Sequence, residues 1–225
     1  MTDKLLQSRY IYDSDSHIDR FRYKGKSWDL VKLQWWSHRF EYRWACDAAY
    51  VHFDGNYEDV IDFVVDKPHA FPFFLSKIGF KNVKFSGLFD FTSWPDYPLA
   101  DGKIEHLKED IKKASLGTAS CVTCLSVLHE LPPDDQISVL NNLIDHVEDG
   151  GCLILTIQVP RAKYEVNLGA YLLTLRDSGM KYELSDEIGT PITTKDNNVA
   201  PHKYRCLRPA LKCYRLFAWK DLPEE

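Results

Sequence analysis

The sequence lacks a hydrophobic run long enough to span a membrane. Its longest apolar stretches, Val60–Val65 and Cys152–Ile157, fall far short of the roughly 20 residues that a bilayer requires. The first residues, Met-Thr-Asp-Lys, do not contain the apolar segment of a secretory signal peptide. We therefore expect a cytoplasmic protein that makes no use of a membrane.

Motifs of two large enzyme groups are also missing. No Gly-x-x-x-x-Gly-Lys sequence is present, which excludes kinases, helicases and other enzymes that hold nucleotides in a P-loop. No Gly-x-Ser-x-Gly sequence is present, which argues against an α/β-hydrolase. What remains is a chain of 225 residues, 44% hydrophobic and 27% charged, and this composition is typical of one folded domain.

The six cysteines show no framework of paired spacings. Without a secretory signal, we expect free thiols in a reducing compartment. Cys121 and Cys124 have the spacing of a zinc or redox pair, but no second pair follows at the distance of a zinc ribbon. They also lie in a predicted strand, where residues three apart face opposite sides of a sheet. The sequence thus predicts neither a metal site nor disulfides.

The net charge of −5 hides an uneven distribution. Residues 1–43 and 201–220 are basic, whereas residues 44–200 are strongly acidic. One interpretation is a charged surface in water, and the other is that the basic ends meet an anionic partner or substrate.

From residue 57 onward, short apolar runs alternate with amphipathic segments, which favours βαβ units and a parallel sheet. The predicted strands are Val60–Val65, Val83–Phe89, Cys121–Val127, Cys152–Val159 and Lys212–Trp219. The predicted helices are Phe71–Ile78, a charged segment near Lys108–Ala114, a helix capped by Asp134 and closed at Asp149–Gly151, and Leu168–Ser178. Ile188–His202 is predicted to be a loop.

The first fifty residues are rich in aromatic side chains. Trp36, Phe40 and Trp44 recur at helical spacing, which predicts a helix that packs this stripe on the sheet. Arg39 and Arg43 lie between them, and aromatic rings beside cations also suit a nucleotide-like ligand. Both interpretations stay open.

The most specific stretch of residues 59–160 is Cys121–Leu131, followed by an amphipathic helix from Leu140 to Val147, Asp149-Gly-Gly and the strand around Leu153–Thr156. In this order of elements, residues 59–160 resemble the class I S-adenosylmethionine-dependent methyltransferases. The resemblance implies an α/β fold, a Rossmann-like doubly wound sheet with an aromatic N-terminal helical extension. We place the extension at residues 1–50 and the methyltransferase-like part at 51–225, within a single structural domain.

The resemblance also implies S-adenosylmethionine as cofactor, bound across the carboxyl ends of the strands. The loop after the first strand departs from the family, because Val64 and Asp66 stand where glycines normally leave room for the cofactor. Two outcomes follow. Either the loop takes another path and Asp62 or Asp66 meets the amino group of the cofactor, or the protein is a catalytically inactive binding or assembly module.

Further site residues follow from the resemblance alone. Cofactor contacts are expected from Asp62, Val64, Asp66, Asp90, Asp110, Ile111, Leu125 and Ser126. His129 and Glu130 are expected at the acceptor, His129 with a pKa suited to proton transfer. Acceptor binding is expected from Trp36, Arg39, Arg43, Lys203 and Arg205. The implied reaction is methyl transfer to an oxygen or nitrogen of a small or nucleotide-like acceptor, with the guanine of an RNA cap as one candidate.

Overall fold

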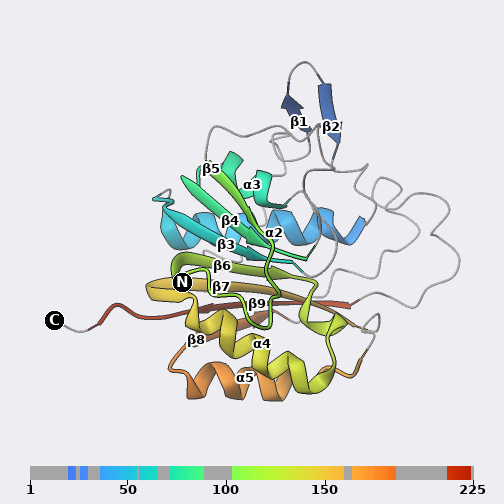
Figure 1. Ribbon diagram of the computed structural model, residues 1–225, viewed down its shortest axis with the longest axis vertical. Coiled ribbons are helices and arrows are strands. Elements are labelled where there is room, and N and C mark those ends of the chain that lie inside the picture. Colours follow the sequence, from blue (N-terminus) through green and yellow to red (C-terminus); the bar gives the residue numbers. More distant parts are fainter. Residues whose placement is uncertain are drawn as a thin grey trace, which may run out of the picture.

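One twisted sheet of seven strands forms the centre of the molecule (Figure 1). The computed structural model describes residues 20–23, 26–29, 36–54, 56–64, 71–88, 103–159, 164–185 and 212–223. The strand order is β5-β4-β3-β6-β7-β9-β8. These strands are β3 (Asp59–Phe63), β4 (Asn82–Ser86), β5 (Lys103–Leu107), β6 (Ala119–Leu125), β7 (Val147–Val159), β8 (Lys181–Ser185) and β9 (Lys212–Trp219).

Chain direction divides the sheet into a parallel part and an antiparallel insertion. The neighbouring pairs from β5 to β7 are all parallel, whereas β9 runs antiparallel to both β7 and β8. The chain builds outward from β3 to β5 on one side, then returns to the centre and builds from β6 to β7 on the other. The strand order therefore reverses between β3 and β6, which is where open α/β sheets bind ligands.

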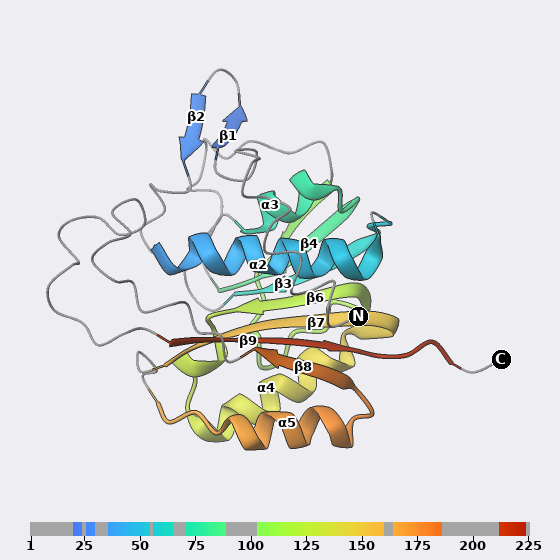
Figure 2. The same ribbon diagram turned by 180° about the vertical axis from the view of Figure 1, so that it is seen from behind.

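Helices cover both faces of the sheet, as Figure 2 shows. On one face lie α2 (Trp36–Phe53) and α3 (Phe71–Ile78), which share a buried cluster with Val60 and Cys121. On the other face lie α4 (Pro133–Asp145) and α5 (Leu168–Asp177), which pack on Val122 and Leu153. A separate two-stranded hairpin is formed by β1 (Arg20–Tyr23) and β2 (Lys26–Asp29). This arrangement confirms the predicted α/β, Rossmann-like sheet.

The central strand β6 follows directly from its sequence, because all seven of its residues are apolar or small and all are buried. Cys121 packs toward α2 and α3, whereas Cys124 packs toward α4 and α5. The two thiols face opposite sides, as predicted. Cys46, Cys121, Cys124 and Cys152 are buried free thiols.

Small side chains of the leading helix α2 face the sheet and let the helix axis come close to it. Tyr42, Ala45 and Ala49 are buried, and Trp44 is half-buried and packs against the same cluster. The side chains of Trp36 and Phe40, the other members of the predicted aromatic stripe, lie outside the described part of the structure. The helix also continues across residue 50, where we placed the boundary of the N-terminal extension.

Two predicted details around α4 are wrong. Residues 108–114 form no helix but a turn, because the side chain of Asp110 accepts a hydrogen bond from the backbone N–H of Lys112. The cap of α4 is Pro132, with Pro133 at the first helical position, so Asp134 lies inside the first turn.

The end of α4 also differs from the prediction. The helix ends at Asp145, and the ring of His146 bonds the carbonyl of Asn142 and the N–H of Leu116. Val147 therefore starts β7 instead of continuing the helix, and the segment Asp149–Gly151 lies within that strand. There the pairing with β6 shifts register between Ala119 and Cys121.

Candidate functional site

Polar side chains gather at the carboxyl ends of the central strands. Buried polar side chains need hydrogen-bond partners, so their presence there needs a cause. The set consists of Asp62 on β3, Thr123 on β6, Ser126 just after β6, Thr156 and Gln158 on β7, and Glu41 from α2. All are buried except Ser126, which is half-buried.

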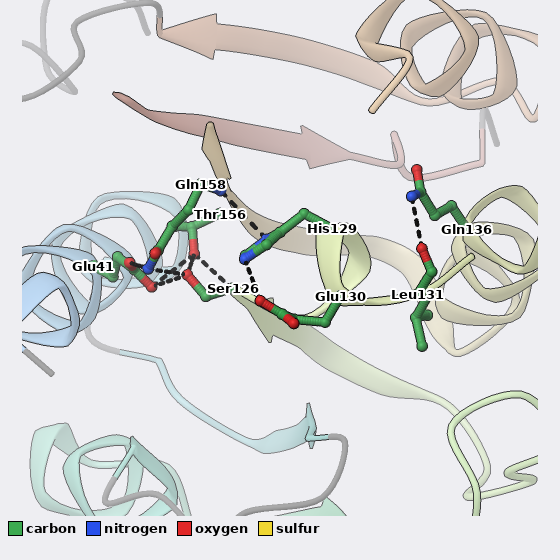
Figure 3. Close-up of polar contacts among 8 residues, drawn as sticks. All are labelled: Glu41, Ser126, His129, Glu130, Leu131, Gln136, Thr156 and Gln158. Carbon is green, nitrogen blue, oxygen red and sulfur yellow. Dashed lines mark hydrogen bonds and ion pairs between the residues drawn. The ribbon is translucent and has the colours of Figure 1, made fainter. Parts of the chain in front are cut away.

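Glu41 is the centre of this polar group, as Figure 3 shows. Its Oε2 accepts hydrogen bonds from the hydroxyls of Ser126, at 2.6 Å, and Thr156, at 3.0 Å. Its Oε1 accepts one from the Gln158 amide at 2.5 Å. The amide of Gln158 also donates to the Ser126 hydroxyl at 2.8 Å. These contacts fix α2 to the carboxyl ends of β6 and β7.

Ser126 has an unusual backbone conformation, with φ of +58°. This backbone conformation is unfavourable for a residue with a side chain, so the conformation persists only where the surrounding structure stabilises it. The N–H of Ser126 is held by both the carbonyl and the hydroxyl of Thr156, and its side chain is held by Glu41. The chain therefore leaves β6 along a fixed path into the short 3-10 helix Leu128–Glu130.

His129 is 2% exposed and is fixed by the same strand end. The backbone N–H of Gln158 donates to its Nδ1 at 3.3 Å, which assigns the proton to Nε2. Nε2 lies 3.4 Å from Oε1 of Glu130, a half-exposed carboxylate. Burial lowers the pKa of His129 to about 4, although Glu41 opposes this shift. The expectation of a pKa near neutrality is wrong, because the ring is desolvated.

Asp62 lies completely buried near the end of β3. It is paired in register with Thr123, whose hydroxyl donates to Oδ1 of Asp62 at 2.6 Å. The two strands that flank the reversal of strand order, β3 and β6, are therefore joined by a side-chain hydrogen bond as well as by their backbones.

A second hydrogen-bond group holds the segments beside this edge. The Gln136 amide donates to the carbonyls of Leu131 and Glu165, and its oxygen accepts from the hydroxyl of Tyr171 at 2.6 Å. This fixes the start of α4 to the segment before α5. Burial raises the pKa of Tyr171, so its hydroxyl keeps its proton and remains a donor.

Comparison with known proteins gives structural matches only. No protein-family model matches the chain, and neither does any curated protein sequence. Among solved structures, magnesium protoporphyrin IX methyltransferase from Synechocystis with bound S-adenosylmethionine aligns over 98% of both chains, with a TM-score of 0.55 and 18% identity. The N-methyltransferase NodS from Bradyrhizobium japonicum, in complex with S-adenosyl-L-homocysteine, covers 80% of this chain and 86% of its own, with a TM-score of 0.55 and 11% identity.

A third match is an S-adenosylmethionine-dependent methyltransferase from Clostridium acetobutylicum, which aligns over 78% of this chain and 90% of its own with a TM-score of 0.51 and 10% identity. The chain has the fold of the class I S-adenosylmethionine-dependent methyltransferases. The resemblance seen in the sequence is confirmed at the level of the fold.

Within the methyltransferase fold, the strand ends offer groups that suit the cofactor. Ser86, the last residue of β4, is fully buried, and its hydroxyl has no hydrogen-bond partner within the part of the chain that the structure describes. Val64 continues the pairing of β3 with β4, because its N–H donates to the carbonyl of Ser86. The branched side chain of Val64 thus belongs to the sheet rather than to the loop. These residues fit a ligand that brings hydroxyl and amino groups to this edge.

Of the other predicted cofactor residues, some lie at the ends of the central strands and others do not. Leu125 ends β6 and Ser126 follows it, so both lie at the reversal point of the methyltransferase fold. Ile111 packs in the core on the α4 side, and its carbonyl accepts from the Asn142 amide. The side chain of Asp110 is engaged by the N–H of Lys112 in the local turn.

Several predicted residues cannot be placed against this site. Asp66, Asp90, Lys203 and Arg205 lie outside the described residues. Trp36, Arg39 and Arg43 lie on α2, but their side chains lie outside the described part of the structure. Among the described residues, no group of three or more His, Cys, Asp or Glu side chains is arranged to hold a metal ion. Those residues also include no helix long and apolar enough to cross a membrane.

Sequence reasoning missed Glu41, Thr123, Thr156 and Gln158. One signal was available for the β7 pair. Thr156 and Gln158 interrupt a buried apolar strand at alternate positions, so they point to the same face. Two polar side chains on one face of a central strand need partners, and the partner here is Glu41.

Proposed function

We propose that the protein is a methyltransferase that uses S-adenosylmethionine and acts on an oxygen or nitrogen of a small or nucleotide-like acceptor. The observation that carries this proposal is the polar group around Glu41 and Ser126, at the reversal point of a methyltransferase fold. When bound, the cofactor supplies an activated methyl group, so the protein mainly has to hold and orient its ligands.

We assign the roles of the chain's own residues from their positions, hydrogen bonds and exposure. Asp62 is positioned to accept from the amino group of the cofactor, and Leu125 and Ser126 line its inner side. His129 carries its proton on Nε2, so it orients an acceptor by donating a hydrogen bond. Glu130 is half-exposed and accepts the proton of a hydroxyl acceptor. A ring nitrogen with a free lone pair needs no such base.

Cofactor binding tests the proposal. Calorimetric titration with S-adenosylmethionine and with S-adenosylhomocysteine is expected to detect binding of both. Replacing Asp62 by Asn keeps an acceptor for the Thr123 hydroxyl but removes the charge, and we expect about tenfold weaker binding of both ligands. Asp59→Asn is the matched control, because Asp59 starts the same strand, is exposed, and is expected to leave binding unchanged.

The alternative is a binding or assembly module that has lost the cofactor. It predicts no heat and no thermal shift with either ligand at millimolar concentration. That result, for a cooperatively folded protein, would reject the enzyme proposal. An effect of Asp59→Asn equal to that of Asp62→Asn would reject the assigned role of Asp62.

For the acceptor, we propose an anionic or nucleotide-like molecule, with an RNA cap as one candidate. The support is the basic character of residues 1–43 and 201–220. Binding of short capped RNA is expected to weaken about tenfold or more between 50 and 200 mM salt, because phosphate contacts release counterions. An affinity that is independent of salt would reject an RNA acceptor. Fluorescence anisotropy measures this directly.

A cytoplasmic location fits the same proposal. Its support is the set of buried free thiols, Cys46, Cys121, Cys124 and Cys152. Free thiols are typical of a reducing compartment.

A further inference from the structure

Glu41 places a negative charge inside the protein, at the ends of β6 and β7. Only 2% of the surface of this residue is exposed to solvent. Both carboxylate oxygens accept hydrogen bonds, and the donors are the two hydroxyls and the amide of Ser126, Thr156 and Gln158. Three donors that converge on the two oxygens stabilise the ionised form of the carboxyl group by hydrogen bonding.

All three donors are neutral, so they solvate the charge but do not cancel it. Within the described residues, no lysine or arginine forms an ion pair with Glu41. The guanidinium of Arg215, on the neighbouring strand β9, lies over the ring of Trp44 at 5.7 Å from its centroid. His129, which feels the charge of Glu41, is neutral above pH 5 because its pKa is about 4.

Buried charges in proteins are normally paired, because desolvation of an unpaired ion is costly. Glu41 is instead surrounded by a preorganised set of dipoles, which is an arrangement suited to a ligand that brings the opposite charge. Holding a desolvated carboxylate ready for that ligand makes the folded chain less stable.

The position of Glu41 indicates where the ligand's charge would lie. Its Oε2 is 2.6 Å from the hydroxyl of Ser126, the residue that directly follows β6. β6 and β3 flank the reversal of strand order, and ligands of open α/β sheets bind beyond the carboxyl ends of such a strand pair. The carboxylate therefore lies beside the part of the proposed cofactor site that Ser126 lines.

We propose that Glu41 recognises the positive charge of the sulfonium group of S-adenosylmethionine, and that it does so by electrostatic attraction. This inference rests on the proposed function and adds to it a preference for S-adenosylmethionine over S-adenosylhomocysteine. S-adenosylmethionine is cationic at sulfur, whereas S-adenosylhomocysteine has a neutral thioether there. A carboxylate near that sulfur binds the first ligand more strongly than the second, and so favours the methyl donor over the spent cofactor.

The test compares the two ligands in a Glu41→Gln variant by calorimetric titration. Glutamine keeps the shape of the side chain, and the hydroxyls of Ser126 and Thr156 can rotate to accept from its amide. We expect S-adenosylmethionine to bind about tenfold more weakly, and S-adenosylhomocysteine to stay within about twofold of the wild type. Asp47→Asn is the matched control, because it removes another buried carboxylate of α2, and it is expected to change neither affinity.

The outcomes separate charge recognition from a structural role. Equal weakening of both ligands would overturn the inference, because it would mean that Glu41 only shapes the site. Unchanged binding of S-adenosylmethionine would overturn it as well. Failure of the wild-type protein to bind either ligand would overturn the proposed function together with this inference, so the two failures are distinguishable.

The wild-type protein supplies a second measurement that does not depend on how the variant folds. We expect it to bind S-adenosylmethionine about tenfold more tightly than S-adenosylhomocysteine at low and at moderate salt, because a buried charge is poorly screened. Equal or tighter binding of S-adenosylhomocysteine would overturn the inference.

Discussion

Lowering the pH from about 6.5 to about 4 is expected to cost the folded protein about 3 kcal/mol of stability through His129 alone. Burial lowers the pKa of His129 to about 4 in the folded state. In the unfolded chain the ring titrates near its ordinary value, so between these two pH values only the unfolded state binds the proton. Stability therefore falls as pH falls through this window, and the contribution of His129 is constant above it.

Urea denaturation of the wild type and of a His129→Asn variant at several pH values measures this contribution. Asparagine does not titrate, and its oxygen can still accept the N–H of Gln158. The variant is expected to lose less stability than the wild type over the same window, while the difference between them stays constant from pH 7 to 8. Parallel curves across the whole range would show that His129 titrates normally.

Replacing Gly151 by alanine is expected to destabilise the fold by about 2–3 kcal/mol. A Cβ at this position would lie 2.7 Å from the carbonyl oxygen of Ser120 and 3.0 Å from that of Glu148. Both are backbone atoms, one of them on the neighbouring strand β6, so no side-chain rotation relieves the overlap. The strands would have to separate where their register shifts.

Gly117→Ala is the control for Gly151→Ala. Gly117 has a φ of +80°, but nothing lies within 4 Å of the added Cβ. This substitution should cost about 1 kcal/mol through backbone strain alone. The comparison uses the midpoints of urea denaturation, with the slope unchanged in both variants. Equal losses would mean that contact between the strands is not what requires glycine at residue 151.

The parts of the fold that were predictable are those whose signal is local. Helix α3 has the predicted bounds, because its apolar period is regular and Gly79, at φ of +125°, ends it. β6 was recognisable because a strand buried on both faces is continuously apolar. β9 was predicted with its correct bounds as well, although its antiparallel direction is not visible in its residues.

The edge strands were missed because their composition is different. β5, Lys-Ile-Glu-His-Leu, and β8, Lys-Tyr-Glu-Leu-Ser, lie at the two edges of the sheet. Charged residues are common on edge strands, where one side meets solvent and where charge discourages pairing with other chains. Such strands look like loops or helices in a sequence pattern.

Candidate residues could be named from the sequence only where they lie on a recognisable strand or directly after it. Asp62 lies on β3, and Ser126 and His129 continue β6. Glu41 could not be named, because its partners lie far away along the chain. A carboxylate in an aromatic helix shows no periodicity that would pair it with Gln158. The lowered pKa of His129 could not be predicted from the sequence either, since burial is a property of the folded chain.

The place of β9 in the sheet has a consequence for how the chain folds as it is made. Residues 212–219 follow every other strand of the described sheet along the chain, yet they lie between β7 and β8. Until that segment has left the ribosome, β7 and β8 present two unpaired strand edges with a gap between them. Such edges are prone to aggregation, and closing the gap requires contacts between residues distant in sequence, which fold slowly. The sheet is thus completed only after residues 212–219 have been made, well after the strands on either side of them.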